Sequence, residues 1–244
     1  MTRSALITGG SRGIGLAIGR RLASEGWSML ITGRKQDTLD DAAQTLTDSG
    51  AARVRTVACD MADPDVAEIL ISEYGKSFRA IDALILNAGV GTAGPIDTYP
   101  MRRFDKTIDV NLRAPFALLQ AAMPLLHNAV AADPAHGAKV IALASLAGVY
   151  PEAGLAAYGA TKAALLSVID TLNSEQSGSG ITGTAIAPGY VDTDMSAWIT
   201  DRIPADTMIS VDDIVELVAA LTRLSPRAVV SRVVVTRAGA GLQA

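Results

Sequence analysis

Residues 8–15 read TGGSRGIG, a cluster of glycines between two regular patterns. It follows the apolar run 5–8 and opens a helical pattern over 14–25. Glycine permits a tight turn and close backbone approach, and the helix start offers unpaired N–H groups and a positive dipole end. A glycine cluster alone is also typical of an ordinary turn. The strand before it and the helix after it favour a site for the diphosphate of a dinucleotide.

Working outward, short apolar runs alternate with helical patterns along the whole chain. The runs predict seven strands, over 5–8, 28–32, 54–59, 83–86, 140–144, 184–187 and 233–236. The intervening periodicity predicts helices over 14–25, 37–48, 65–74, 103–127, 158–175 and 212–224. Strands that are apolar at nearly every position are typical of a parallel sheet covered on both faces. We therefore expect an α/β, doubly wound Rossmann fold with a mainly parallel sheet, forming a single domain over 1–244.

The composition excludes several classes of partner. The chain has 244 residues and a net charge of −4, so no broad positive field exists to hold nucleic acid or an anionic membrane. The mean hydropathy is +0.29, yet no apolar run approaches the roughly 20 residues of a membrane-spanning helix. Cys59 is the single cysteine and cannot form an intrachain disulfide, and the N-terminus lacks a signal-peptide pattern. We expect a cytoplasmic protein without a metal site.

The end of the second predicted strand indicates which dinucleotide binds. Many NAD sites place an acidic residue there to hold the ribose 2′-hydroxyl, about 20 residues beyond the glycines. Here the strand ends in Gly33 and Arg34, and an arginine pairs instead with a 2′-phosphate. Arg12 in the glycine turn can approach the same group, so we expect NADP(H). We interpret Asp37 as the N-cap of the second helix.

Ser145, Tyr158 and Lys162 form a candidate catalytic group. The spacing of Tyr158 and Lys162 at the start of a helix places both on one face. An ammonium group nearby favours the phenolate of a tyrosine, whose free pKa is near 10. Ser145 follows the fifth predicted strand, where its hydroxyl can hydrogen-bond a substrate oxygen. The pair Y-x-x-x-K alone is common by chance, and its combination with the other features carries the prediction.

These motifs together resemble the short-chain dehydrogenase/reductase family. The chain is similar to the short-form branch and to its 3-oxoacyl-[acyl-carrier-protein] reductase-like members. The matching features are T-G-x-x-x-G-x-G at residues 8–15, N-A-G at residues 87–89, and the serine thirteen residues before Y-x-x-x-K. The resemblance implies that Asn111 completes a catalytic tetrad by holding a water that contacts Lys162. It also implies that Tyr158 is the acid/base in hydride transfer between a nicotinamide and a carbonyl or secondary alcohol.

The resemblance also assigns the cofactor contacts. Lys162 is expected to hold the nicotinamide ribose, Asp60 to lie near the adenine, and Thr193 to contact the carboxamide. The predicted cofactor-binding residues are Gly9, Ser11, Arg12, Gly13, Ile14, Gly15, Arg34, Asp60, Asn87, Ala88, Gly89, Tyr158, Lys162, Pro188, Gly189, Val191 and Thr193.

The substrate is expected to meet two irregular stretches, 89–100 and 189–210, which follow strand ends. The substrate loop is placed at about 189–210, and the predicted substrate contacts are Leu146, Val149, Tyr190 and Trp198. A small carbonyl compound or alcohol is expected, with an acyl-carrier-linked substrate as one possibility. In that case Arg102, Arg103 and Lys106 are candidates for docking an acidic carrier.

Two alternatives stay open at this point. The first is an NADP(H)-dependent oxidoreductase, and the second is a non-catalytic binding module that senses the NADP(H) redox state. A sensor has no need of the tetrad Asn111, Ser145, Tyr158 and Lys162, so its presence favours the enzyme. Family resemblance also implies a homotetramer or a homodimer.

Overall fold

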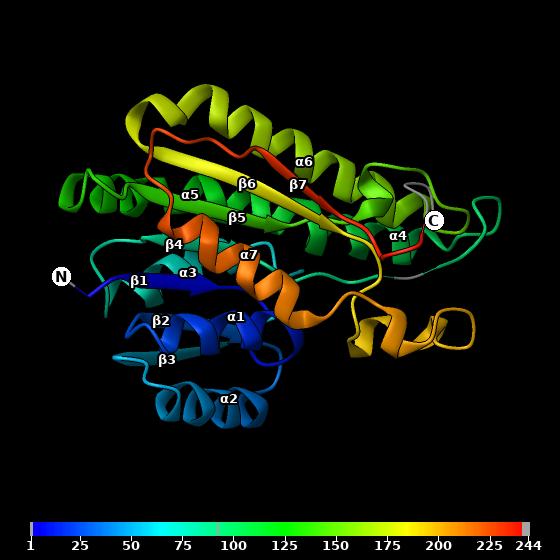
Figure 1. Ribbon diagram of the computed structural model, residues 1–244, viewed down its shortest axis with the longest axis horizontal. Helices are drawn as coiled ribbons and strands as arrows, with labels where there is room; N and C mark the ends of the chain where they lie inside the picture. Colours follow the sequence, from blue (N-terminus) through cyan, green and yellow to red (C-terminus); the bar gives the residue numbers. More distant parts are fainter. Residues whose placement is uncertain (1, 92, 241–244) are drawn as a thin grey trace.

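A computed structural model describes residues 2–91 and 93–240, and its centre is one seven-stranded sheet in the order β3-β2-β1-β4-β5-β6-β7 (Figure 1). Every neighbouring pair is parallel. The strands are β1 (Ser4–Ile7), β2 (Ser28–Gly33), β3 (Arg53–Ala58), β4 (Ala83–Leu86), β5 (Ala138–Leu143), β6 (Ile181–Pro188) and β7 (Arg232–Val235). The expected doubly wound Rossmann fold is confirmed.

Helices cover both faces of the sheet. They are α1 (Gly13–Ala23), α2 (Gln36–Asp48), α3 (Val66–Gly75), α4 (Met101–Ile108), α5 (Ala114–Ala132), α6 (Ala156–Gln176) and α7 (Val211–Arg223). One apolar core lies between the sheet and α1, α2 and α7, and a second lies beneath α3, α5 and α6. In residues 2–91 and 93–240, no helix is both long and apolar enough to cross a membrane.

The central strands and the edge strands differ in burial. All residues of β1, β4, β5 and β6 are buried, as expected for strands covered on both faces. The edge strands β3 and β7 alternate between exposed and partly buried positions. The strand order reverses between β1 and β4, and in open parallel sheets ligands bind beyond the strand ends at such a point.

The single helix predicted over 103–127 is wrong, because the structure divides this stretch. Helix α4 ends at Ile108, a π-helical turn covers Asp109–Arg113, and α5 begins at Ala114. Pro115 at the start of α5 lacks a backbone N–H and disfavours regular helix just before it. The break positions Asn111 within the π-helical turn.

The prediction that Asp37 caps the second helix is also wrong. Lys35 occupies the N-cap position in an extended conformation, and no side chain caps this helix end. Asp37 lies inside the first turn, where its negative charge complements the helix dipole without acting as the cap.

Candidate active site

A cleft of about 330 Å³ lies at the carboxyl ends of the strands, where the order reverses. Most of the residues predicted from sequence line it. Those lining the cleft are Gly9, Ser11, Arg12, Gly13, Ile14, Arg34, Asp60, Asn87, Ala88, Gly89, Ser145, Leu146, Tyr158, Lys162, Pro188, Gly189, Tyr190, Val191, Thr193 and Trp198. Gly15, Asn111 and Val149 do not line it. Val149 packs against the apolar core beneath α5 and α6 instead.

The glycine turn folds tightly against the start of α1. A Cβ atom at Gly15 would lie 2.3 Å from the carbonyl oxygen of Gly9 and 2.5 Å from Nδ2 of Asn87, so only glycine fits. Gly13 has a positive φ of 53°, and a Cβ there would meet nothing within 4 Å. The turn is therefore packed on its inner side and open at Gly13, which lines the cleft.

The N-A-G stretch after β4 fastens this turn to the sheet. Asn87 donates from Nδ2 to the carbonyl oxygens of Thr8 and Gly9, at 2.9 and 3.1 Å. The Thr8 hydroxyl in turn accepts from the backbone N–H groups of Asn87 and Ala88, each at 3.0 Å. These bonds satisfy polar groups that would otherwise be buried without partners, so the two loops form one rigid wall.

Ser145 and Tyr158 meet at the floor of the cleft. Ser145 lies two residues beyond β5 and caps the 3₁₀ turn Leu146–Gly148, with its hydroxyl accepting from the N–H of Ala147 at 3.2 Å. Burial raises the pKa of the Tyr158 hydroxyl, and its hydrogen bond with Ser145 lowers that pKa in part. Without a further positive charge, Tyr158 is therefore a protonated donor.

Lys162 lies one helical turn after Tyr158 and is only 4% exposed. Its Nζ donates to the carbonyl oxygen of Leu143 at 2.7 Å and lies 5.6 Å from the centre of the Tyr158 ring. Burial lowers the pKa of Lys162 from 10.5 to about 8. This ammonium group has no carboxylate partner in the described part of the chain, so its field acts on Tyr158 without local neutralisation.

Asn111 supports this group from behind. Its amide bonds both backbone groups of Val90, accepting from the N–H and donating to the carbonyl oxygen, each at 2.8 Å. It also donates to the Thr161 hydroxyl at 3.2 Å. A Cβ at Gly89 would lie 3.4 Å from Oδ1 of Asn111 and 3.5 Å from Nζ of Lys162. The Asn111 side chain thus clamps residue 90 beside Lys162.

Two arginines lie at the other end of the cleft, with different surroundings. Arg34 follows β2 and makes no hydrogen bond or ion pair with residues 2–91 and 93–240. Arg12 pairs through Nη1 with Oδ2 of Asp194, at 2.8 Å, although both side chains are largely exposed. Arg34 is therefore available to a phosphate, and Arg12 joins the glycine turn to the irregular stretch 189–210.

The cleft fits a dinucleotide on grounds of shape and charge. Gly13 opens the turn toward the cleft, the N-terminus of α1 begins there, and Arg34 offers a free guanidinium. No acidic side chain ends β2. Asp60 also lines the cleft, while its Oδ1 accepts from the N–H of Ala62 at 3.0 Å, as a turn residue does.

Glu152 lines the cleft beside the predicted residues Tyr190 and Trp198, and the sequence analysis did not single it out. Tyr190 donates from its hydroxyl to Oε1 of Glu152 at 2.5 Å, and the Tyr190 ring lies edge-on to Trp198 with centroids 6.2 Å apart. A Cβ at Gly91 would lie 3.6 Å from the Tyr158 ring and 4.0 Å from Sδ of Met195. Glu152 lies in the irregular segment between Ser145 and Tyr158, and no motif marks it.

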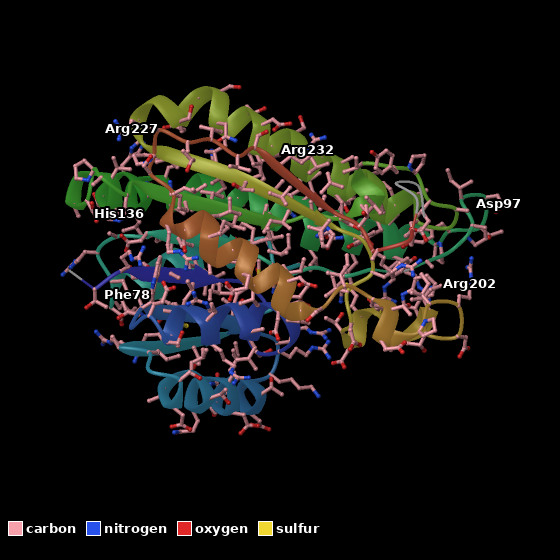
Figure 2. All side chains as sticks on the ribbon, viewed as in Figure 1. Phe78, Asp97, His136, Arg202, Arg227 and Arg232 are labelled. Carbon is pink, nitrogen blue, oxygen red and sulfur yellow. The ribbon has the colours of Figure 1, made fainter. Side chains whose placement is uncertain are left out.

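The histidines lie away from this chemistry. His136 contacts Asp133 at 2.8 Å on the surface, at the end of the molecule opposite Asp97 and Arg202 (Figure 2). Among the residues that the structure describes, no group of three or more His, Cys, Asp or Glu side chains could hold a metal ion.

A Rossmann fold with a tyrosine and a lysine at the floor of its dinucleotide cleft defines a class of nicotinamide-dependent oxidoreductases. The profile of the short chain dehydrogenase family matches residues 3–203. Sulfoacetaldehyde reductase 2 from Chromohalobacter salexigens is 31% identical over 227 residues, which cover 89% of this chain and 87% of that protein. The chain belongs to the short-chain dehydrogenase/reductase family, whose members are oxidoreductases acting on small molecules.

Two solved structures are similar over nearly the whole chain. A short chain dehydrogenase from Burkholderia cenocepacia in complex with NADP is 31% identical, with a TM-score of 0.85 and coverage of 100% of this chain and 98% of that one. A 3-oxoacyl-[acyl-carrier protein] reductase from Brucella melitensis in complex with NAD is 27% identical, with a TM-score of 0.85 and coverage of 97% and 95%. Relatives with this fold therefore include one that binds NADP and another that binds NAD.

Proposed function

We propose that this protein is an NADP(H)-dependent carbonyl reductase, or alcohol dehydrogenase in reverse, with Tyr158 as its acid/base. The observation that carries the proposal is the convergence of Ser145, Tyr158 and a buried, unneutralised Lys162 on the floor of a dinucleotide cleft. Burying a charge without a counter-ion costs free energy, and perturbed buried groups of this kind cluster at functional sites. Here the charge lies beside the one group whose proton must move. A redox sensor has no use for that arrangement.

The mechanism assigns one task to each side chain. Ser145 and Tyr158 donate hydrogen bonds to the carbonyl oxygen and orient it, and these bonds strengthen as negative charge develops there. Tyr158 then transfers its hydroxyl proton to that oxygen, which yields the alcohol. The Lys162 ammonium stabilises the resulting phenolate until solvent returns the proton. NADPH supplies the hydride to the carbonyl carbon when it is bound. Asn111, through Val90, holds the wall beside Lys162.

The preference for NADP(H) is supported by Arg34. It follows β2, lines the cleft and is free to bind a 2′-phosphate with two of its N–H groups. No carboxylate ends β2 to bind the 2′-hydroxyl of NAD. The other predicted cofactor contacts, including Ser11, Ile14, Pro188 and Thr193, line the same cleft, which supports their role in binding the cofactor.

The test is NADPH oxidation with a panel of ketones, diketones, 3-oxoacyl thioesters, sugars and sulfoacetaldehyde. Tyr158→Phe is the matched variant, because it removes only the hydroxyl. We expect turnover of one substrate class by the wild type, a loss of at least about a thousandfold in Tyr158→Phe, and nearly unchanged NADPH binding. Full activity in Tyr158→Phe would refute the mechanism, and NADPH binding without any turnover would favour the sensor.

Acyl-carrier substrates and self-association belong to the same proposal. Arg102, Arg103 and Lys106 lie exposed on α4, and Lys106 lines the cleft, as docking of an acidic carrier requires. Met101 and Phe116, on α4 and α5, are 64% and 54% exposed, which supports a homodimer or homotetramer through these helices. Light scattering after gel filtration measures that state.

A further inference from the structure

The cleft holds a second polar pair beyond the group at Tyr158. Glu152 lies in the segment between β5 and α6, and Tyr190 follows β6, so the pair joins two separate loops. The Tyr190 hydroxyl donates to Oε1 of Glu152 at 2.5 Å, a length typical of an O–H bond to a carboxylate. Both residues line the same cleft as Tyr158. The pair is therefore part of the wall that a substrate meets.

The surroundings of Tyr190 hold the pair in place. Its ring packs edge-on against Trp198, with an interplanar angle of 67°. Burial, and then the bond to Glu152, raise the pKa of the Tyr190 hydroxyl, so it stays protonated and donates. Tyr158 and Arg202 also act on the pKa of Tyr190, so this residue lies near both. Arg202 lies with Asp97 at one end of the molecule (Figure 2).

Glu152 retains an oxygen atom with no partner. Oε1 accepts from Tyr190, while Oε2 makes no hydrogen bond or ion pair with any residue that the structure describes. No cation makes an ion pair with Glu152 in the part of the chain that the structure describes. Arg202 lies near Tyr190 without bonding Glu152, and Arg12 in the same cleft is bound to Asp194. The charge anchored at the substrate end is therefore negative.

We propose that Glu152, positioned by Tyr190, selects the substrate, an inference that rests on the proposed reductase function. It favours carbonyl compounds whose far end carries an ammonium or hydroxyl group, and it rejects compounds with a carboxylate or sulfonate there. The free oxygen Oε2 accepts a hydrogen bond from such a donor, and a charge-assisted bond is the stronger kind. An anionic group at the same place would meet the like charge of the Glu152 carboxylate.

The experiment measures ligand binding apart from turnover. Four acetophenones with para methyl, hydroxymethyl, aminomethyl or carboxylate groups are titrated into the NADPH complex, with binding read from NADPH fluorescence. Tyr158→Phe serves as the background, so no ketone is consumed. Glu152→Gln and Tyr190→Phe are compared in it, with Asp97→Asn as the matched control, because Asp97 is an exposed acid at the same end of the molecule that does not line the cleft.

We expect the aminomethyl ketone to bind at least about tenfold more tightly than the methyl ketone, and the carboxylate to bind most weakly. Glu152→Gln should abolish the preference between ammonium and methyl, Tyr190→Phe should reduce it about threefold, and Asp97→Asn should preserve it. A merely structural role would weaken all four ketones equally and leave their ratios intact.

Three results would overturn the proposal: unchanged ratios in Glu152→Gln, tightest binding of the carboxylate, or no saturable binding of any ketone. Turnover in the wild-type background separates this proposal from the function on which it rests. If the ketones bind in the expected order but none is reduced with NADPH, the reductase proposal fails and the selection by Glu152 stands. If a ketone is reduced with NADPH while Glu152→Gln changes no binding ratio, the selection by Glu152 fails and the reductase proposal stands.

Discussion

The two halves of the cleft are held by bonds of different kinds. In the glycine-turn half, residues 8–15 and 87–89, the side chains of Thr8 and Asn87 bond partly buried backbone groups. In the loop half, the two segments, residues 146–155 and 189–210, are joined by a bond between two side chains, from Tyr190 to Glu152. Arg12 and Asp194, which connect the two halves, are 68% and 80% exposed. Removing a buried partner costs roughly 1–3 kcal/mol, whereas an exposed ion pair contributes roughly 0–1 kcal/mol. The first half therefore tolerates little change, and the second is free to vary.

The sharpest test of this contrast is Gly15→Ala in the glycine-turn half. The added methyl group would lie 2.3 Å from a backbone oxygen that cannot move without breaking the turn. We expect the free energy of unfolding to fall by about 3 kcal/mol and NADPH binding to be lost. Urea unfolding and fluorescence titration measure the two effects.

Gly178→Ala is the matched control, because a Cβ there would meet nothing within 4 Å and the residue has no positive φ. It should change the free energy of unfolding by less than about 0.5 kcal/mol. Equal effects of the two substitutions would show that the glycine turn is no more tightly packed than a surface loop.

Arg34→Asp has the next largest expected effect and tests the cofactor end alone. Replacing the guanidinium with a carboxylate removes the partner of a 2′-phosphate and adds repulsion. We expect the ratio of kcat/KM for NADPH to that for NADH to fall about a hundredfold, with unchanged stability. Arg227→Asp is the control, because Arg227 is an exposed arginine at the opposite end of the molecule (Figure 2). A ratio that does not move would mean that the 2′-phosphate binds elsewhere.

The pH dependence of kcat/KM tests the role of Lys162, which lines the cleft that both halves form. Its pKa of about 8 means that the ammonium is lost as the pH rises through 8. We expect kcat/KM for reduction to fall about tenfold per pH unit above that point, because the phenolate of Tyr158 loses its stabilising charge. A profile that stays flat to high pH would contradict this role.

Stability should change in the opposite direction over the same range. In the unfolded chain Lys162 stays protonated up to 10.5, so between about 8 and 10.5 the unfolded state binds more protons and stability rises with pH. The gain is up to about 3 kcal/mol and is measured as the difference between the wild type and Lys162→Met. If activity falls while the free energy of unfolding rises, unfolding is excluded as the cause of the lost activity.

Asp194→Asn in the loop half has the smallest expected effect. Because both partners are exposed, loss of the ion pair should lower the free energy of unfolding by no more than about 0.5 kcal/mol. NADPH affinity should change about twofold at low ionic strength and not at all at high ionic strength. A large loss of stability or NADPH affinity that salt does not reduce would show that the loop half is held as firmly as the glycine-turn half.

The same contrast explains which features could be predicted from sequence. The glycine turn, the N-A-G stretch and the Tyr158–Lys162 pair depend on local backbone geometry at strand ends, so their spacing was enough to place them in one cleft. The alternation of strands and helices was likewise enough for the sheet. The loop half depends on contacts such as Tyr190 to Glu152, which join residues 38 positions apart through exposed side chains. No spacing rule reveals such a pair.

The residues that mark helix ends in the sequence are poor guides to two of the helices in the structure. The break before α5 was missed although Pro115 marked it, because the apolar periodicity continues across the π-helical turn. Asp37 was assigned as a cap from its residue type, but the chain turns into the helix two residues earlier. Val149 is predicted as a substrate contact from its neighbours in sequence, whereas in the structure it is partly buried, packs against the apolar core and does not line the cleft.

The strand order also makes the two ends of the chain unequal during synthesis and in engineering. β1 is made before both of its partners, β2 and β4, so its hydrogen bonding is incomplete until residue 86 has emerged. β7 is made after its partner β6 and, among the described residues, pairs with no other strand. Trimming the chain into β1 removes a central strand whose side chains contribute to both apolar cores, whereas trimming into β7 shortens an edge. Deletions and fusions that alter the last strand should therefore be far better tolerated than those that alter the first.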